Sequence, residues 1–506
     1  MQKRLKATVA CLTAKIPTQL KRAICARSHG PIPSHAPTPQ PAAAESAETP
    51  AEQENPPLEG DFWATATPER RRRGELTVRA EANARLETVD LVDMRAVTMT
   101  MFENGETHLT QSGDPNDAVA DFSPITVHGV LDNGRKITLV DAMGTAKFGH
   151  QSFLVRYVLD GAHLDGHNQR FSAVRFQLDD PGWWTKLDSG VTSEAGPLGS
   201  FSVSREDRLV WFVFEFNKSV TLRECDSSII LPARTLANLA TMLNFELGPT
   251  QLRVDREGSP WVTVLSKSRA SEPVVFSGSR PPEILLTPAK VLTIERFAQW
   301  IKASADMDGL PSVVANPPTN VSIETKALTM ASVAEGLHRR LFQEAKRFQT
   351  ITKAERKIAR NAAVTAGVAA FQQAGYSDLK EVRDALTNAL GHVTDVTYRS
   401  RLEDLNQEAA SVVPEITVSF QDPTWAELVV KTRNLLAHQL EDEERTMLQK
   451  IDAMTLVAWS LPWVLRIVLL LRAGIEPAVI RDGVVKFRPF QYYEANVAAI
   501  QSKHQH

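Results

Sequence analysis

Cysteine is scarce in this sequence. The 506 residues include only Cys11, Cys25 and Cys225. Three scattered cysteines exclude a disulfide framework and a cysteine-rich zinc site, and a reducing cytoplasm is the simplest location. An excess of either charge is also missing, because 57 Lys and Arg residues stand against 60 Asp and Glu residues, a formal net charge of −3. This balance excludes a basic protein of the histone or ribosomal kind, although it allows a local basic patch.

Long uninterrupted apolar runs are missing as well. The most apolar stretch, 456–471, is shorter than the ~20 residues that cross a bilayer, and it contains Pro462 and Arg466. We therefore predict a buried helix of a bundle and no membrane partner. Residues 1–30 are basic without an acidic residue and lack a long apolar core, so we predict no secretory signal there.

The common catalytic signatures are absent too. The chain has no GxxxxGK[ST], no GxGxxG after a predicted strand, no HExxH, no CxxC and no GxSxG. Most ordinary enzyme classes therefore find no support. The sequence HLDGH (163–167) could ligate a metal through its two histidines, or it could form an Asp-Gly hairpin turn. Because no second ligand group accompanies it at a recognisable spacing, we predict no metal and no cofactor.

Composition divides the chain into three parts, in keeping with roughly 150 residues per domain. Residues 1–58 are predicted to be a disordered basic arm followed by a linker rich in Pro, Ala and Glu. Residues 59–320 are predicted to be β-rich, either as two packed sheets or as two smaller β units. Residues 321–506 are predicted to be an all-α bundle. The fold class is thus α+β, with several domains.

Short β-branched or aromatic runs, several of them separated by turn dipeptides, carry the β prediction. The expected strands are 75–80, 124–131, 136–142, 152–159, 171–178, 209–216 and 261–266, with a helix at 231–248. Apolar residues at helical spacing carry the α prediction. The expected helices are 327–349, 353–375, 379–410, 423–460, 463–472 and 490–502.

A polar cluster, RNLLAH (433–438), lies within the expected helix 423–460, for which Asp422 and Pro423 form a start signal. One stripe of this helix should face the core, and it comprises Trp425, Leu428, Val429, Thr432, Leu435 and Leu436. Asn434 and His438 are four residues apart and share a face away from that stripe, while Arg433 lies about 140° from His438. A histidine in mid-helix and off the core face indicates an interface or a site.

These residue types suit the cleavage of RNA without a metal. A histidine with a pKa near ~6.5 can act as base or acid at neutral pH. An arginine fork matches the non-bridging oxygens of a phosphate and stabilises the charge that develops on them. One chain supplies one such histidine, so a symmetric dimer would supply a second. R-N-x-x-x-H is by itself a short pattern that also recurs by chance.

The residues around this pattern resemble a known family. Three segments are similar to the helical domain of ApeA-like anti-phage proteins, whose C-terminal domain is a HEPN ribonuclease: ASVAEGLHRRLF (331–342), YRSRLEDL (398–405) and TWAELVVKTRNLLAHQ (424–439). The β-rich region resembles the N-terminal domain of the same family. The matching segments are GDFWATATPERRRRGELTV (60–78), ITVHGVLDNGRKITLVDA (125–142), YVLDGAHLDGHNQRFSAVRFQL (157–178) and the pair Trp183 and Trp184.

The resemblance implies a cytoplasmic, metal-independent endoribonuclease that acts in abortive infection, with RNA such as tRNA as its substrate. It implies a homodimer through the HEPN domain and a phage-derived trigger for the β domain. Arg433 would bind phosphate, Asn434 would orient the active-site groups and His438 would be the base or acid. Glu335 and His338, on the first helix of the bundle, could approach the site as supporting groups.

Other observations leave alternatives open. Four acidic residues follow directly after the histidine in HQLEDEER (438–445), where they could be solvated, hold a dimer partner or hinder phosphate. The basic arm 1–30 could contact RNA, or it could be a disordered tail or a misplaced start. Arg70–Arg73 are either a solvated turn or an RNA or partner contact. The bundle could also be a non-catalytic dimerisation unit beside a ligand-sensing β domain, or the chain could be the toxin of a toxin–antitoxin pair.

Overall fold

A computed structural model provides the structure of the chain. It describes residues 56–79, 82–90, 92, 97–101, 107–111, 123–147, 150–179, 181–206, 209–254, 259–267, 283–343, 347, 350–391, 393, 395–420, 423–438 and 445–503. The predicted arm and linker therefore lie outside the described residues, apart from residues 56–58. Most of the acidic segment that follows His438 is outside them too.

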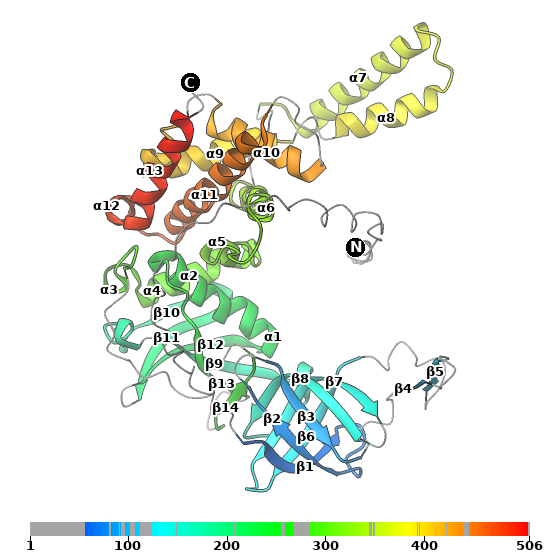
Figure 1. Cartoon of the computed structure of the whole chain (residues 1–506), viewed down its shortest axis with the longest axis vertical. Coiled ribbons are helices and arrows are strands. Elements are labelled where there is room, and N and C mark those ends of the chain that lie inside the picture. Colours follow the sequence, from blue (N-terminus) through cyan, green and yellow to red (C-terminus); the bar gives the residue numbers. More distant parts are fainter. Residues whose placement is uncertain are drawn as a thin grey trace, which may run out of the picture. The chain divides into compact units, whose positions relative to one another are not determined.

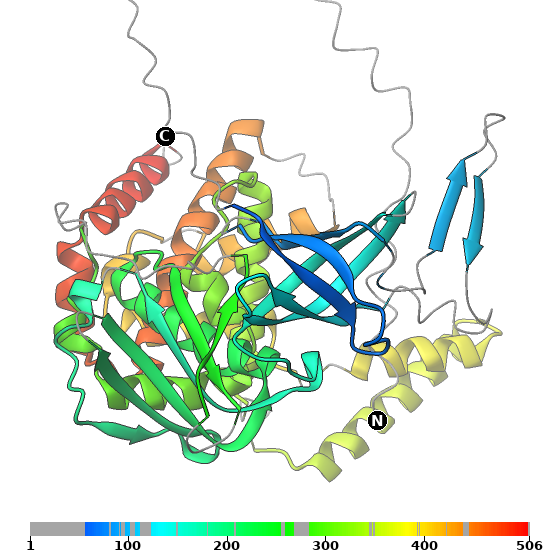
Figure 2. The ribbon, with the colours of Figure 1, turned by 90° about the horizontal axis from the view of Figure 1, so that it is seen from below.

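Six strands of the β region form a closed barrel, drawn in blue and cyan in Figures 1 and 2. They are β1 (Leu58–Ala64), β2 (Arg72–Thr77), β3 (Ala84–Thr88), β6 (Ile125–Leu131), β7 (Lys136–Lys147) and β8 (His150–Asp160). Neighbouring strands are antiparallel, and the pairing of β7 with β8 closes the ring. Side chains alternate in and out along each strand, so every second residue reaches the barrel core, as Phe62, Leu86 and Phe153 do.

The β8 strand also belongs to a second sheet, which continues from the barrel. Its order is β10 (Thr192–Glu194), β11 (Gly199–Glu206), β12 (Leu209–Thr221), β9 (Arg170–Leu178), β13 (Leu247–Arg253), β14 (Val262–Leu265) and β8. The prediction of two packed sheets is wrong, because a closed barrel shares a strand with an open sheet. A further hairpin joins β4 (Val97–Met101) to β5 (Thr107–Gln111).

Short helices cover the second sheet. They are α1 (Leu222–Cys225), α2 (Leu231–Thr241), α3 (Pro288–Val291), α4 (Ile294–Ser304) and α5 (Leu310–Ala315). In the core, Phe297 of α4 stacks on Phe201 with 5.5 Å between ring centroids and lies 5.4 Å from the ring of Phe212. The helix expected at 231–248 corresponds to α2, which ends at Thr241, whereas α3, α4 and α5 were not predicted.

The C-terminal region is helical, as predicted. Its elements are α6 (Ile323–Leu341), α7 (Lys353–Gln373), α8 (Leu379–Gly391), α9 (Tyr398–Ala410), α10 (Trp425–His438), α11 (Met447–Arg472), α12 (Pro477–Lys486) and α13 (Arg488–Ser502). The α11 helix packs against α6, α9, α10, α12 and α13. Helix α11 is long and apolar enough to cross a membrane, but 78% of its most apolar window is buried inside the bundle. The prediction of a buried bundle helix is thus confirmed.

Two long helical predictions are wrong because capping threonines divide them. In 379–410, a new helix starts after Thr397, whose side chain accepts a hydrogen bond from the Ser400 amide. In 423–460, Thr446 forms a capping box with Gln449 and starts α11. The helix expected at 463–472 is the second half of α11, and Pro462 lies inside that helix.

A buried arginine connects α11 to two helices that follow the β strands. Arg466 is 2% exposed, and its guanidinium donates to the carbonyls of Asn238 (3.0 Å) and Leu239 (2.8 Å). It also donates to the carbonyls of Val314 (3.2 Å) and Ala315 (3.1 Å). These carbonyls lie at the C-terminal ends of α2 and α5, where helix dipoles favour a cation. Arg466 therefore connects α11 to α2 and α5 through four hydrogen bonds.

Candidate functional site

The α10 helix carries the R-N-x-x-x-H residues, and Thr424 sets its start. The Thr424 amide donates to the Glu427 carboxylate at 3.0 Å and the Glu427 amide donates to the Thr424 hydroxyl oxygen at 3.4 Å, which together form a capping box. The first helical residue is therefore Trp425 and not Pro423 as predicted, while Asp422 lies outside the described residues. Trp425, Leu428, Val429 and Thr432 of the predicted stripe are buried, whereas Leu435 and Leu436 are only partly covered.

Arg433 is held by residues of two other helices. Its Nη2 donates to Glu335 Oε2 of α6 at 3.0 Å, and its guanidinium carbon lies 4.7 Å from the ring centroid of Tyr398 of α9. The Tyr398 hydroxyl donates to the Ala331 carbonyl at 2.9 Å, and burial raises the pKa of this phenol. An ion pair and a cation–π contact thus fix the guanidinium of Arg433 in place.

Part of Arg433 has no hydrogen-bond partner. Its Nε is buried without a partner among the described residues, and so is the Oγ1 of the preceding residue, Thr432. A buried polar atom without a partner costs about 1–3 kcal/mol, so native proteins seldom keep one in an ordinary core. Two of the eight such atoms in the described part of the chain thus belong to neighbouring residues of α10.

Asn434 and His438 lie further out. Asn434 is half-buried, whereas His438 is exposed and is the last described residue of α10, because residues 439–444 lie outside the described part of the chain. Neither side chain makes a hydrogen bond to the described part of the chain, and the structure does not bring His438 into contact with Arg433. One chain therefore presents a fixed cation and, five residues later, an accessible imidazole.

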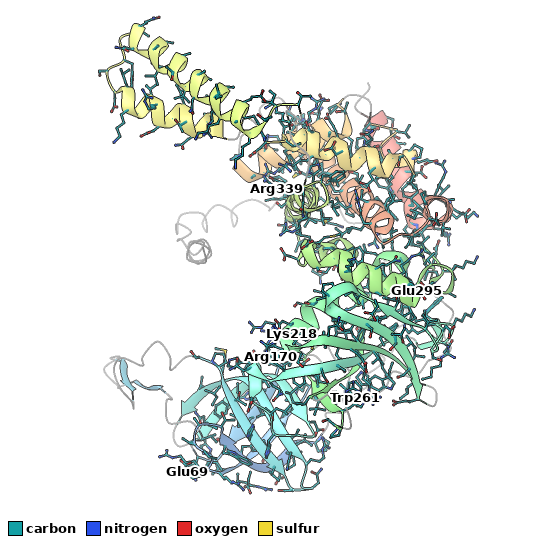
Figure 3. All side chains as sticks on the ribbon, turned by 180° about the vertical axis from the view of Figure 1, so that it is seen from behind. Glu69, Arg170, Lys218, Trp261, Glu295 and Arg339 are labelled. Carbon is teal, nitrogen blue, oxygen red and sulfur yellow. The ribbon has the colours of Figure 1, made fainter. Side chains whose placement is uncertain are left out.

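Glu335, on the first bundle helix α6, contacts Arg433. It accepts from Arg433 through one oxygen and from Arg339 through the other, the latter at 2.8 Å. Arg339 is labelled on α6 in Figure 3. The carboxylate is 23% exposed, so two guanidinium groups share one largely covered negative charge. These three side chains together thus keep one net positive charge.

His338 belongs to a separate hydrogen-bond chain. Arg401 donates to its Nδ1 at 3.1 Å, which leaves the proton on Nε2, and Nε2 donates to Asp404 Oδ2 at 2.8 Å. The ring is fully buried and stacks on Phe342. Burial lowers the pKa of His338, with Asp404 opposing this shift, so the imidazole stays neutral at pH 7. His338 supports the α6–α9 contact and does not touch Arg433.

Sequence reasoning missed the contribution of α9. Tyr398, Arg401 and Asp404 recur at three-residue intervals, which places them near one face of a helix. That spacing was visible in the sequence, but their partners on α6 and α10 were not.

The HLDGH segment serves a structural purpose in the described chain. His163 donates from Nε2 to the Gly129 carbonyl at 3.0 Å, and its ring stacks on that of His128 with 4.6 Å between the ring centroids. The segment connects β8 to β9, which are not neighbours in the sheet, so the hairpin alternative is wrong. The described residues contain no group of three or more His, Cys, Asp or Glu side chains that could hold a metal ion.

The cationic run at the start of the barrel is largely neutralised. Arg72 pairs with Asp90 at 2.9 Å, and Arg73 pairs with Asp132 and, at 2.8 Å, with Glu59. Arg71 lies over the Trp63 ring. Arg72 and Arg73 are the first residues of strand β2, so the prediction of a solvated turn is wrong for these two, and their ion pairs give them a structural role in the barrel.

Comparison with protein families gives two matches. Residues 57–210 match the ApeA N-terminal domain 1, and residues 328–478 match the Apea-like HEPN domain. The first match covers the barrel and the start of the second sheet, and the second covers α6 to the start of α12. Comparisons with curated proteins and with solved structures give no match. Because the two family domains follow one another in one chain, this is an ApeA-like protein with a C-terminal HEPN domain.

Proposed function

We propose that this chain is a metal-independent endoribonuclease of anti-phage defence. HEPN domains are generally nucleases, and the ApeA-like domain pair indicates defence against phage. The observation that carries the proposal is the arrangement on α10. Arg433 is positioned by Glu335 and Tyr398, and an accessible His438 follows on the same helix.

The proposed reaction is attack by the ribose 2′-oxygen on the neighbouring phosphorus. A base takes the 2′-OH proton, the bond to the 5′-oxygen breaks, and an acid protonates that oxygen. His438 is the base or the acid, and Arg433 stabilises the negative charge on the phosphorane oxygens. Asn434 shares the face of His438 and orients it. The products are a 2′,3′-cyclic phosphate and a 5′-hydroxyl.

A homodimer would supply the second imidazole. The first turn of α11 exposes three apolar side chains shortly after His438, since Met447 is 70%, Leu448 63% and Ile451 38% exposed. An apolar cluster of this kind is typical of an interface. We propose that it pairs two copies so that two α10 helices meet, and that the protein acts on RNA, such as tRNA, in the cytoplasm.

Growth and phage protection test this function. Cells expressing wild type, His438→Ala or Arg433→Ala would be grown with and without phage, and their total RNA run on a gel. Wild type should protect and cleave RNA during infection, and both variants should lose protection and cleavage while remaining folded. His167→Ala and Lys218→Ala, exposed residues of the β region, are the matched controls and should behave as wild type.

The opposite results point to the alternatives. Protection by both variants as strong as that of wild type would refute the nuclease and favour a non-catalytic binding protein with a sensing β domain. Toxicity without phage, relieved by a small co-purifying protein, would identify a toxin–antitoxin pair and would contradict activation by phage.

A further inference from the structure

The first two turns of α7 carry four cations on one face. Lys353, Arg356, Lys357 and Arg360 recur at spacings i, i+3, i+4 and i+7. At 100° per residue they fall within an arc of about 100°, and they span about 10 Å along the helix. Lys353 and Lys357 are exposed, and the two arginines are partly exposed. We call these four residues the α7 basic face.

No described carboxylate neutralises this face. None of the four side chains forms an ion pair within the described part of the chain. The one acid among them, Glu355, accepts from the Thr352 amide at 2.8 Å in the capping box of α7. Hydrogen bonds to the side chain and the amide of Thr352 lower the pKa of Glu355 and hold its carboxylate at the start of the helix.

The neighbouring helix leaves the face uncovered. The α7 and α8 helices pack on each other around a small core of their own (Figure 1). Gly367 of α7 is level with Leu386 of α8, because a Cβ at Gly367 would lie 2.6 Å from Leu386 Cδ1. From that level α8 continues for only five residues, to Gly391, whereas α7 extends fourteen residues back to Lys353. The first turns of α7 thus overhang α8 by about 13 Å, and residues 385–391 of α8 carry no charge.

Along the sequence, the α7 basic face lies between two helices that contribute to the candidate site. The α7–α8 hairpin is inserted between α6, which carries Glu335, and α9, which carries Tyr398. Both residues hold Arg433. The basic end of α7 is the end that follows α6, so the cations lie at the base of the hairpin rather than at its tip.

We propose that the α7 basic face binds the phosphate backbone of RNA and holds the substrate for cleavage by the α10 residues. The proposal rests on the proposed ribonuclease function and adds a substrate-binding surface to it. Four cations on one helix face that form no ion pair with the described residues, without an apolar side chain among them, fit a polyanion better than a protein surface. Because these contacts reach phosphates and not bases, they confer affinity without sequence preference.

Salt-dependent RNA binding tests the proposal. Fluorescein-labelled tRNA would be titrated with full-length His438→Ala protein, which binds RNA without cleaving it, between 50 and 300 mM KCl. The fourfold variant K353Q/R356Q/K357Q/R360Q in the same background should bind roughly 10- to 100-fold more weakly. The slope of log K against log salt should become shallower by about 3, the value for four lost phosphate contacts.

The matched control is K380Q/R383Q, which neutralises two exposed cations of α8, beside Glu381 and Asp384 in the same hairpin. It should keep the affinity and the slope. A K353R/K357R variant retains the charge and should bind RNA as tightly as the parent does. If this variant also loses RNA binding, the weaker binding of the fourfold variant would be due to misfolding, and the proposal would be overturned.

The two hypotheses fail in distinguishable ways. If the fourfold variant keeps the parent salt slope while the active protein cleaves RNA, the α7 proposal is wrong and the ribonuclease stands. If the fourfold variant loses affinity and slope while the active protein cleaves nothing, the surface binds RNA and the catalytic proposal is wrong.

Discussion

Replacing Arg466 by methionine should strongly destabilise the protein. The substitution keeps much of the buried volume but removes a guanidinium that donates to four backbone carbonyls. Of these acceptors, the Asn238 carbonyl retains a hydrogen bond from the Met242 amide. The other three would lose the buried donor that now satisfies them.

The magnitude follows from these contacts. Each hydrogen bond contributes about 1 kcal/mol net, so four amount to about 4 kcal/mol. Breaking a buried charged interaction by removing one partner costs about 3–5 kcal/mol, which agrees. For a unit of 150–250 residues, each kcal/mol lowers Tm by about 2–4 °C, so the transition that includes α11 should fall by on the order of 10 °C.

Scanning calorimetry of wild type, R466M and R472M would measure this effect. Arg472 lies on the same helix, but it is partly exposed and pairs with Glu408 at 2.7 Å. Losing that surface pair should cost less than about 1 kcal/mol. An R466M protein as stable as wild type, or an R472M protein destabilised equally, would refute the assignment of Arg466 as the connection between α11 and helices α2 and α5.

Two further predictions concern the surroundings of Arg433. Tyr398→Leu removes the ring beneath the guanidinium and should slow RNA cleavage roughly 3- to 30-fold, from a contact of about 0.5–2 kcal/mol. Tyr398→Phe keeps the ring and should leave the rate nearly unchanged, so equal losses of rate in the two variants would contradict the cation–π contact. The pKa of His338 lies below its ordinary 6.5, so the unfolded chain takes up that proton first and stability should fall as pH drops below about 6.5. Urea unfolding at pH 5 to 7.5 should show a smaller decrease for His338→Gln, and an unchanged decrease would indicate that His338 is not the buried neutral group described.

The sequence contains enough local information to predict many of the elements. Strands β6, β7, β8 and β9 lie where β-branched and aromatic residues alternate, and helices α7 and α13 lie close to their predicted bounds. Closure of the barrel was not predictable in this way, because it depends on the pairing of β7 with β8 and of β8 with three different strands. Strand β3 was missed since its outward residues, Arg85 and Glu87, hide its short apolar pattern.

Long-range contacts explain why the candidate site was only partly predictable. The register of α10 follows from its apolar spacing, and Glu335 was named as a supporting residue. Tyr398 was not, because its contact with Arg433 joins two helices that are separate in the sequence. Arg466 was taken as an interruption of an apolar run, since nothing in the local sequence shows that carbonyls from α2 and α5 surround it. The predicted boundaries at 58/59 and 320/321 stay predictions.

The chemistry of the RNA ends tests the central proposal most directly. Purified wild type would be incubated with labelled tRNA with and without EDTA, and the termini of the fragments analysed. Attack by the 2′-oxygen with His438 and Arg433 predicts 2′,3′-cyclic phosphate and 5′-hydroxyl ends, formed equally in EDTA and absent with His438→Ala. Fragments with 3′-hydroxyl and 5′-phosphate ends, or equal cleavage by His438→Ala, would contradict it.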